Sequence, residues 1–381
     1  MAKTFFTIPS LLVMLLGLPL LGVTLSGEAL SKYLEFPPKT IHLTPAPFSR
    51  AAFAFYSLFI LVILTPLIWH TLKKARIGFT SSISAPLPWW GYLGILFGST
   101  FWILAWSRFP WFRVFQPFTF TPLWVGYIIS MNALAFRRQG HCLLLDDPFS
   151  FLLLFPASAA FWWLFEYLNR FVQNWHYTGV QFSPLEYFLY ASLSFSTVLP
   201  AFASTREWVA SFPALGRFQS FFPLRVPRPT RVALLTLVAA GTGLLLLGIY
   251  PDYVFPLLWI SPLLILVSLQ ALMKQPHVFS SLGHGDWRGI LSSALAALVC
   301  GFFWEMWNYY SLASWVYHIP FVQHLHLFEM PLLGYAGYLP FGLQCAVVAE
   351  MVLARSGKNA RARTTSQQAP RPGEPPAWRC V

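Results

Sequence analysis

Ten long apolar stretches constrain the fold of this chain more than any motif does. They lie near residues 8–26, 50–70, 89–106, 119–136, 150–171, 185–203, 232–250, 254–273, 288–309 and 330–353. A helix that crosses a bilayer needs about 20 mainly apolar residues. Because 56% of the residues are hydrophobic and only 10% are charged, a water-soluble core cannot bury so much apolar surface. The sequence therefore predicts an all-α, multi-pass membrane protein with about ten transmembrane helices.

The basic residues predict how these helices are oriented. If the N-terminus lies inside, 19 of the 25 Lys and Arg residues fall in inner segments, as short cytoplasmic loops require. This predicts an N-in, C-in topology in the membrane, most simply the bacterial inner membrane. The net charge of +12 then indicates contact between the inner loops and anionic lipid head groups. We expect no nucleic-acid partner.

The chain divides into four parts by composition. Residues 1–205 hold helices 1–6, and we expect the first helix to be retained rather than cleaved as a signal peptide. Residues 206–231 form a basic, proline-rich inner loop. Residues 232–353 hold helices 7–10, and residues 354–381 have too little apolar surface to fold. The last part is therefore predicted to be a disordered cytoplasmic tail.

One string of residues occurs twice in the apolar part of the chain. The first copy runs Phe161-Trp-Trp-Leu-Phe-Glu166-Tyr-Leu-Asn169 and continues to Trp175-His176-Tyr177. The second copy runs Phe302-Phe-Trp304-Glu305-Met-Trp307-Asn308 and continues to Trp315-Val-Tyr317-His318. Because the two copies are offset by four predicted helices, lying on helices 5–6 and 9–10, both have the same orientation, which predicts a parallel internal repeat.

The carboxyl and amide groups of the repeat are candidate catalytic groups, because ionisable residues inside a bilayer are costly and usually functional. Each Glu and its Asn lie three residues apart, on one face of a helix. A carboxyl group in apolar surroundings keeps its proton and serves as a general acid. We therefore expect Glu166 and Glu305 to supply a proton and Asn169 and Asn308 to orient them. The candidate proton acceptors open the next helix of each copy and are Glu186 and Glu329.

Aromatic residues surround these acids in both copies. Their π faces attract cationic centres, so they are candidate substrate-binding residues: Trp162, Trp163, Trp175, Tyr177, Trp304, Trp307, Trp315 and Tyr317. Two structural explanations remain open. Trp and Tyr gather at membrane interfaces in ordinary proteins, and a Glu/Asn pair can simply join helices by hydrogen bonds.

Histidines give a weaker candidate site. His324 and His326 lie close to Glu329 and are possible zinc or iron ligands. Their spacing is not that of one helix face, and the first copy has only His176 in the corresponding region. The sequence therefore favours a site without metal or other cofactor.

The order of an acid, an Asn, a Trp-x-Tyr element and then Pro and Glu resembles the duplicated module of the small integral-membrane lycopene cyclases. The resemblance covers about 161–200 and 302–345. It departs from that family in having one Glu where adjacent acids are typical, and in placing Pro331 after Glu329. The resemblance implies an enzyme that acts on an isoprenoid or other apolar lipid by acid-initiated cyclisation or hydration.

Two other classes of function fit the same residues. The acids would bind a proton or cation in a non-enzymatic transporter or lipid-binding protein, and the aromatics would pack against other subunits in a structural membrane protein. The sequence leaves the substrate, the active copy and the oligomeric state open.

Overall fold

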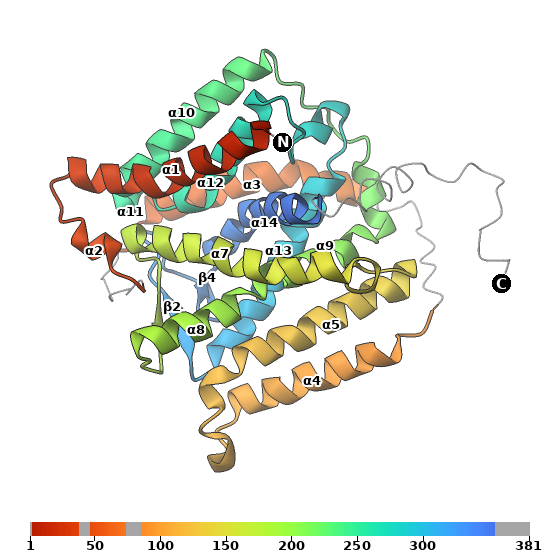
Figure 1. The fold of residues 1–381 in the computed structure, drawn as a ribbon. Coiled ribbons are helices and arrows are strands. Elements are labelled where there is room, and N and C mark those ends of the chain that lie inside the picture. Colours follow the sequence, from red (N-terminus) through yellow and green to blue (C-terminus); the bar gives the residue numbers. More distant parts are fainter. Residues whose placement is uncertain (1, 38–45, 74–84, 355–381) are drawn as a thin grey trace, which may run out of the picture.

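The structure, a computed structural model, describes residues 2–37, 46–73 and 85–354 of the chain. Most of these residues are helical (Figure 1). The α-helices are α1 (Ala2–Leu25), α2 (Ser31–Leu34), α3 (Arg50–Lys73), α4 (Trp89–Trp106), α5 (Phe120–Gln139), α6 (Leu143–Asp146), α7 (Pro148–Val172), α8 (Pro184–Phe195), α9 (Val198–Ala210), α10 (Pro229–Leu247), α11 (Pro251–Val254), α12 (Leu257–Leu272), α13 (Arg288–Tyr309) and α14 (Tyr338–Leu353). The 3-10 helices are η1 (Pro110–Phe112), η2 (Gln116–Phe118), η3 (Pro213–Phe218), η4 (Ser280–His284) and η5 (Leu332–Gly337). The predicted tail, apart from its first residue, lies outside the described residues.

Within the described residues, seven helical segments are long and apolar enough to cross a membrane, which confirms the predicted class of protein. They are Arg50–Lys73, Gln116–Gln139, Pro148–Val172, Pro184–Ala210, Pro229–Leu247, Arg288–Tyr309 and Leu332–Leu353. Two further apolar helices, Pro9–Leu25 and Leu257–Leu272, are shorter. Each of the ten predicted stretches contains helix. The number of crossings and the sidedness stay predictions.

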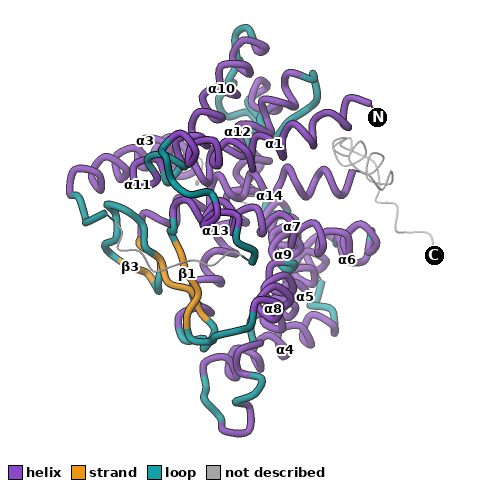
Figure 2. The backbone as a smooth tube through the Cα atoms, turned by 60° about the vertical axis from the view of Figure 1, so that its left-hand side comes forward, coloured by secondary structure: helices purple, strands orange, loops and turns teal. Residues whose placement is uncertain are grey.

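The β-strands lie at one end of the helical bundle, and the two ends of the described chain lie toward the other end. In Figures 1 and 2, α1 begins and α14 ends toward one end of the bundle, and the β-strands lie toward the other. Helix α1 packs closely on α10, because a Cβ added to Gly22 would lie 2.0 Å from the carbonyl oxygen of Leu245. Such small residues let backbones approach each other where helices meet in membranes. The first helix is therefore an integral part of the bundle.

The single helix predicted over 185–203 is two helices, α8 and α9. Pro200 lies in the first turn of α9 and cannot donate a backbone hydrogen bond to the preceding turn. Ser158 of α7 forms hydrogen bonds with backbone groups that the break leaves free of helical partners. Its hydroxyl donates to the carbonyl of Phe195 at 2.5 Å and accepts from the amide of Leu199 at 2.9 Å. Helix α9 also continues to Ala210, so the predicted loop boundary at residue 205 is wrong.

The described part of the chain also forms two small antiparallel sheets that the all-α prediction missed (Figure 2). Strand β1 (Trp175–Thr178) pairs with β2 (Ser314–Tyr317), and β3 (His326–Leu327) pairs with β4 (Met330–Pro331). In the first sheet Trp175 lies opposite Tyr317, and Tyr177 lies opposite Trp315. Because β1 follows α7 and β2 follows α13, this sheet joins the two copies of the repeated string.

Candidate functional site

Both asparagines of the repeat hold a strand of the first sheet in place. The amide nitrogen of Asn169 donates to the carbonyl of Trp175 at 2.8 Å, and its oxygen accepts from the amide of Asn174 at 2.8 Å. Asn308 donates to the carbonyl of Trp315 at 2.7 Å and accepts from the amide of the same residue at 2.8 Å. The two amides therefore position the strands, and the structure gives neither of them a direct hydrogen bond to a carboxyl group.

Glu166 is fully buried near the end of α7 and gathers aromatic donors on one oxygen. Its Oε1 accepts from the indole nitrogens of Trp162 at 3.0 Å and Trp175 at 3.1 Å, and from the hydroxyl of Tyr177 at 2.6 Å. Its Oε2 has no hydrogen-bond partner among the described residues. One half of the carboxyl group is therefore saturated, and the other half is buried and unpaired.

Glu305, fully buried near the end of α13, has the same asymmetry. Its Oε1 accepts from the hydroxyls of Tyr317 at 2.8 Å and Tyr338 at 2.5 Å, and its Oε2 has no partner within the described chain. Trp315 does not reach this carboxyl but donates its indole N–H to the hydroxyl of Tyr317 at 2.8 Å. In both copies the strand tyrosine therefore hydrogen-bonds to the helix glutamate.

The strand tyrosines remain neutral hydroxyl groups. Burial, and after it the nearby Glu166, raises the pKa of Tyr177 well above its ordinary value. Burial and Glu305 do the same for the pKa of Tyr317. A neutral phenol both donates and accepts a hydrogen bond, so each tyrosine can link its carboxyl group to a second molecule.

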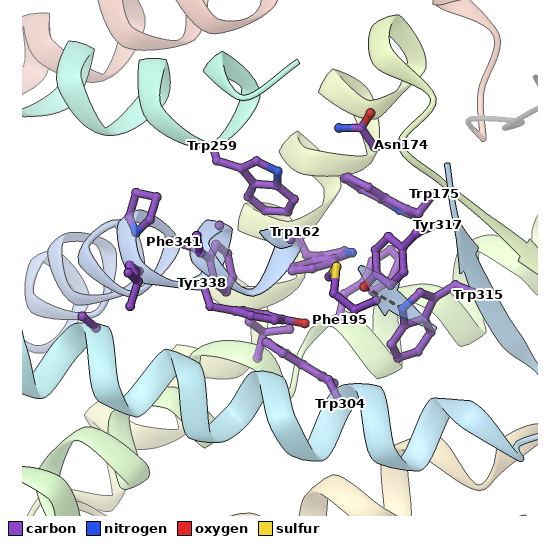
Figure 3. Close-up of a pocket in the computed structure, with 18 of the residues that line it drawn as sticks. Trp162, Asn174, Trp175, Phe195, Trp259, Trp304, Trp315, Tyr317, Tyr338 and Phe341 are labelled. Carbon is purple, nitrogen blue, oxygen red and sulfur yellow. Dashed lines mark hydrogen bonds between the residues drawn. The ribbon is translucent and has the colours of Figure 1, made fainter. Parts of the chain in front are cut away.

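A cavity of about 2010 Å³ lies against these groups. Six of the eight predicted substrate-binding aromatics line it, namely Trp162, Trp175, Tyr177, Trp304, Trp315 and Tyr317. Figure 3 shows Trp162, Trp175, Tyr317, Trp304 and Tyr338 gathered in one group, in which the ring centroids of Trp162 and Trp304 lie 5.8 Å apart. Neither Glu166 nor Glu305 is a lining residue. The acids therefore lie behind the aromatic wall, although their tyrosine donors belong to it.

Two predicted aromatics lie elsewhere. Trp163 donates its indole N–H to the hydroxyl of Ser192 at 2.9 Å, and the ring of Trp307 packs 5.3 Å from that of Trp124. Successive residues of a helix point about 100° apart, so Trp163 cannot share the direction of Trp162. Unlike the other six predicted aromatics, Trp163 and Trp307 do not line this cavity.

The acids that open the next helices also lie away from the cavity. Glu186 is exposed and forms a capping box with Ser183: its Oε2 accepts from the Ser183 amide at 2.9 Å, and its own amide donates to the Ser183 hydroxyl at 3.4 Å. Ser183-Pro-Leu-Glu186 is the sequence signature of that box. Glu329 is half-buried between β3 and β4 and does not line the cavity. The structure thus places neither residue on the wall of the cavity.

The candidate metal ligands do not assemble in the structure. The imidazole of His324 packs 4.9 Å from the ring of Phe48, and Nε2 of His326 lies 3.1 Å from the amide nitrogen of Gln323. Within the described residues, no three His, Cys, Asp or Glu side chains form a group that would hold a metal ion.

Sequence reasoning missed several lining residues, chiefly Trp259, Tyr338 and Phe341. A signal for Tyr338 is present in the sequence. A Tyr-x-x-Tyr pair follows the proline of each copy, as Tyr187 and Tyr190 after Pro184 and as Tyr335 and Tyr338 after Pro331. Three of these four tyrosines line the cavity, the exception being Tyr335.

The chain matches no protein-family profile, no curated protein and no solved structure.

Proposed function

We propose that this protein is a membrane enzyme that binds an isoprenoid or similar apolar lipid in the cavity and starts its cyclisation or hydration by protonation. One observation carries the proposal: the hydroxyls of Tyr177, Tyr317 and Tyr338 hydrogen-bond to buried carboxyl groups, and their side chains line one cavity. The acids thus act through tyrosines and need no direct contact with the lipid.

The size and lining of the cavity favour a lipid over a small polar molecule. Pockets for small molecules usually measure about 300–1,000 Å³, and this one is about 2010 Å³ with a mainly apolar wall. A ligand of this kind enters from the bilayer, and the chemistry needs no soluble cofactor. We also propose that the inner basic residues, among them Arg225 and Arg228, contact anionic lipid head groups.

The proposed reaction moves one proton at a time. The hydroxyl of a strand tyrosine gives its proton to an alkene carbon of the lipid, and the neighbouring carboxyl group returns a proton to the tyrosine oxygen. The carbocation is stabilised by the faces of Trp162 and Trp304. A second double bond closes the ring, and the cation then loses a proton to the tyrosine oxygen, which passes a proton back to the carboxylate. In hydration, water adds to the cation, and its spare proton returns to the carboxylate through the same tyrosine.

The resemblance to the small membrane lycopene cyclases supports the same class of substrate and reaction. The alternative is a lipid-binding protein or transporter without chemistry. It is favoured by one observation, that each Oε1 already accepts two or three hydrogen bonds and is shielded from the cavity. In that case the acids only fix the aromatic wall.

Comparison of lipids from matched cells tests the proposal. Cells would express the intact protein, Glu166→Gln, Glu305→Gln, or the control Glu28→Gln, which alters an exposed residue, at equal membrane levels. Mass spectrometry should find a lipid that changes with the intact protein and the control and reverts in at least one of the other two variants. Identical lipids in all cells would refute the catalytic role and favour the lipid-binding alternative.

A further inference from the structure

A buried arginine lies one helical turn from Glu166. Arg170 follows Glu166 by four residues in α7, so the two side chains share one face of the helix. Arg170 is only 8% exposed, and its charge interacts with those of Glu166 and Glu35. Its Nη1 donates to the carbonyl of Tyr33, whereas its Nε has no hydrogen-bond partner within the described chain. Because a guanidinium group does not lose its proton in proteins, a permanent cation lies beside the first carboxyl group.

Glu166 is better placed than Glu35 to balance this charge. Glu35 is exposed, so water and salt screen its charge. Glu166 is fully buried, and charges attract each other much more strongly away from water. No hydrogen bond joins Glu166 to Arg170 in the described structure, so the attraction acts through space. The other cation nearby, Lys32, is exposed and lies 5.3 Å from the centroid of the Tyr33 ring. The position of Arg170 therefore favours the ionised form of Glu166.

The second copy has no such cation. The residue four positions after Glu305 is Tyr309, and residues 289–354 contain no Lys or Arg. The charged group that interacts with Glu305 is another acid, Glu329, and a like charge disfavours a second carboxylate. Arg108 reaches the end of α13 but donates to backbone carbonyl oxygens there. The surroundings of Glu305 therefore favour its protonated form.

We propose that the two copies have different charges and opposite roles: Arg170 holds Glu166 as a carboxylate that accepts a proton, and Glu305 stays protonated and donates one. This inference rests on the proposed function and divides its two proton transfers between the copies. Arg170 does not line the cavity. It is a positioning residue that acts through Glu166.

The two copies act on the same part of the cavity. Tyr177 and Tyr317 are diagonal neighbours on one face of the first sheet, about 7–8 Å apart. Tyr317 or Tyr338 gives its proton to an alkene carbon, whose π electrons form the new C–H bond, and Glu305 returns a proton to that tyrosine. The cation then loses a proton to the oxygen of Tyr177 as the C–H electrons form a double bond, and Tyr177 passes its own proton to Glu166. Afterwards Glu166 releases a proton to water and Glu305 takes one up.

Infrared spectroscopy of the full chain in nanodiscs tests the inference, because a protonated carboxyl group has a carbonyl band that a carboxylate lacks. Spectra near neutral pH would be compared for the intact protein, Glu166→Gln and Glu305→Gln. The intact protein should show a protonated-carboxyl band that Glu305→Gln removes and Glu166→Gln retains. Loss of the band in Glu166→Gln, or a band that neither variant changes, would overturn the inference.

Replacement of Arg170 tests its role as the counter-ion. Arg170→Gln should add a second band of similar area that Arg170→Gln/Glu166→Gln lacks, and Arg170→Lys, which keeps the charge, should give the spectrum of the intact protein. Glu35→Gln is the matched control and should leave the bands unchanged. If Arg170→Gln adds no band, or if Glu35→Gln adds one, Arg170 is not the counter-ion of Glu166. If Arg170→Gln fails to fold without its bond to Tyr33, the two glutamine variants of the acids still decide the assignment.

The spectra separate this inference from the proposed reaction, because they are recorded without turnover. If the band belongs to Glu305 while Glu166→Gln and Glu305→Gln leave the cellular lipids unchanged, the assignment of charges stands and the catalytic proposal fails. If those variants change a lipid but the band belongs to Glu166, the reaction stands and the division of roles fails.

Discussion

The ring of Tyr338 packs directly against Gly301, so that a Cβ on Gly301 would lie 2.5 Å from a ring carbon. Gly301 stands four residues before Glu305, as Trp162 stands four residues before Glu166. In the first copy Trp162 itself donates to the carboxyl group, and in the second copy the glycine makes room for Tyr338 of α14 to do so. Each buried carboxyl group therefore accepts a hydrogen bond from an aromatic side chain, which comes from the same helix in the first copy and from another helix in the second copy.

Replacing Gly301 with alanine should displace Tyr338 from Glu305. Overpacking of this kind costs about 1–3 kcal/mol, so Gly301→Ala should lower the midpoint of thermal unfolding in detergent. Gly289→Ala is the matched control in the same helix, because its Cβ would meet nothing within 4 Å and alanine suits a helix better than glycine. A variant Gly301→Ala as stable as this control would contradict the close packing.

Removing the hydroxyl of a strand tyrosine should stop the proposed reaction without emptying the cavity. General acid catalysis contributes about 10²–10⁴-fold, so Tyr177→Phe or Tyr317→Phe should reduce product formation at least about 100-fold. Tyr190→Phe is the control, because Tyr190 lines the cavity but bonds to neither carboxyl group. Equal product from all three variants, measured at equal protein levels, would exclude the two strand tyrosines as the proton donors.

Loss of the Asn308 amide should destabilise the sheet that joins the repeats. Leaving the backbone of Trp315 unpaired costs about 1–3 kcal/mol per buried group, so Asn308→Ala should unfold at a lower denaturant concentration. Ser311→Ala should have little effect, because the Ser311 hydroxyl donates to the carbonyl of Trp307 in the last turn of α13. If Asn308→Ala abolished turnover while unfolding normally, the amide would have a chemical role that its hydrogen bonds do not explain.

Glu186 should matter for the start of α8 and not for lipid chemistry. Loss of the capping interaction typically costs about 0.5–2 kcal/mol, so Glu186→Ala should lower the unfolding midpoint slightly while product per folded molecule stays constant. Glu186→Gln should preserve both, because glutamine also forms a capping box. A loss of product in the stable glutamine variant would restore Glu186 as a proton acceptor.

The helical framework was predictable because it depends on local composition. Each apolar stretch is long enough to require a helix, and the break before α9 has a local signal in Pro200. The capping box at Ser183 and Glu186 was likewise visible in the sequence.

The remaining parts of the site depend on contacts that no local pattern specifies. The pairing of Trp175 with Tyr317 joins residues more than a hundred positions apart through strands of only four residues. The bond from Tyr338 to Glu305 depends on how α14 crosses α13 at Gly301. For the same reason, sequence could group the acids with the aromatics but could not show that the aromatics stand between the acids and the cavity.

Deuterium transfer tests the central claim most directly, because it follows the proton itself. The full chain and the double variant Glu166→Gln/Glu305→Gln would be incubated in nanodiscs with the total lipid extract of the expressing cells in heavy water. We predict that the intact protein yields a lipid with carbon-bound deuterium that persists after return to ordinary water, and that the double variant does not. Absence of such a lipid, or equal labelling by both proteins, would contradict acid catalysis by these carboxyl groups.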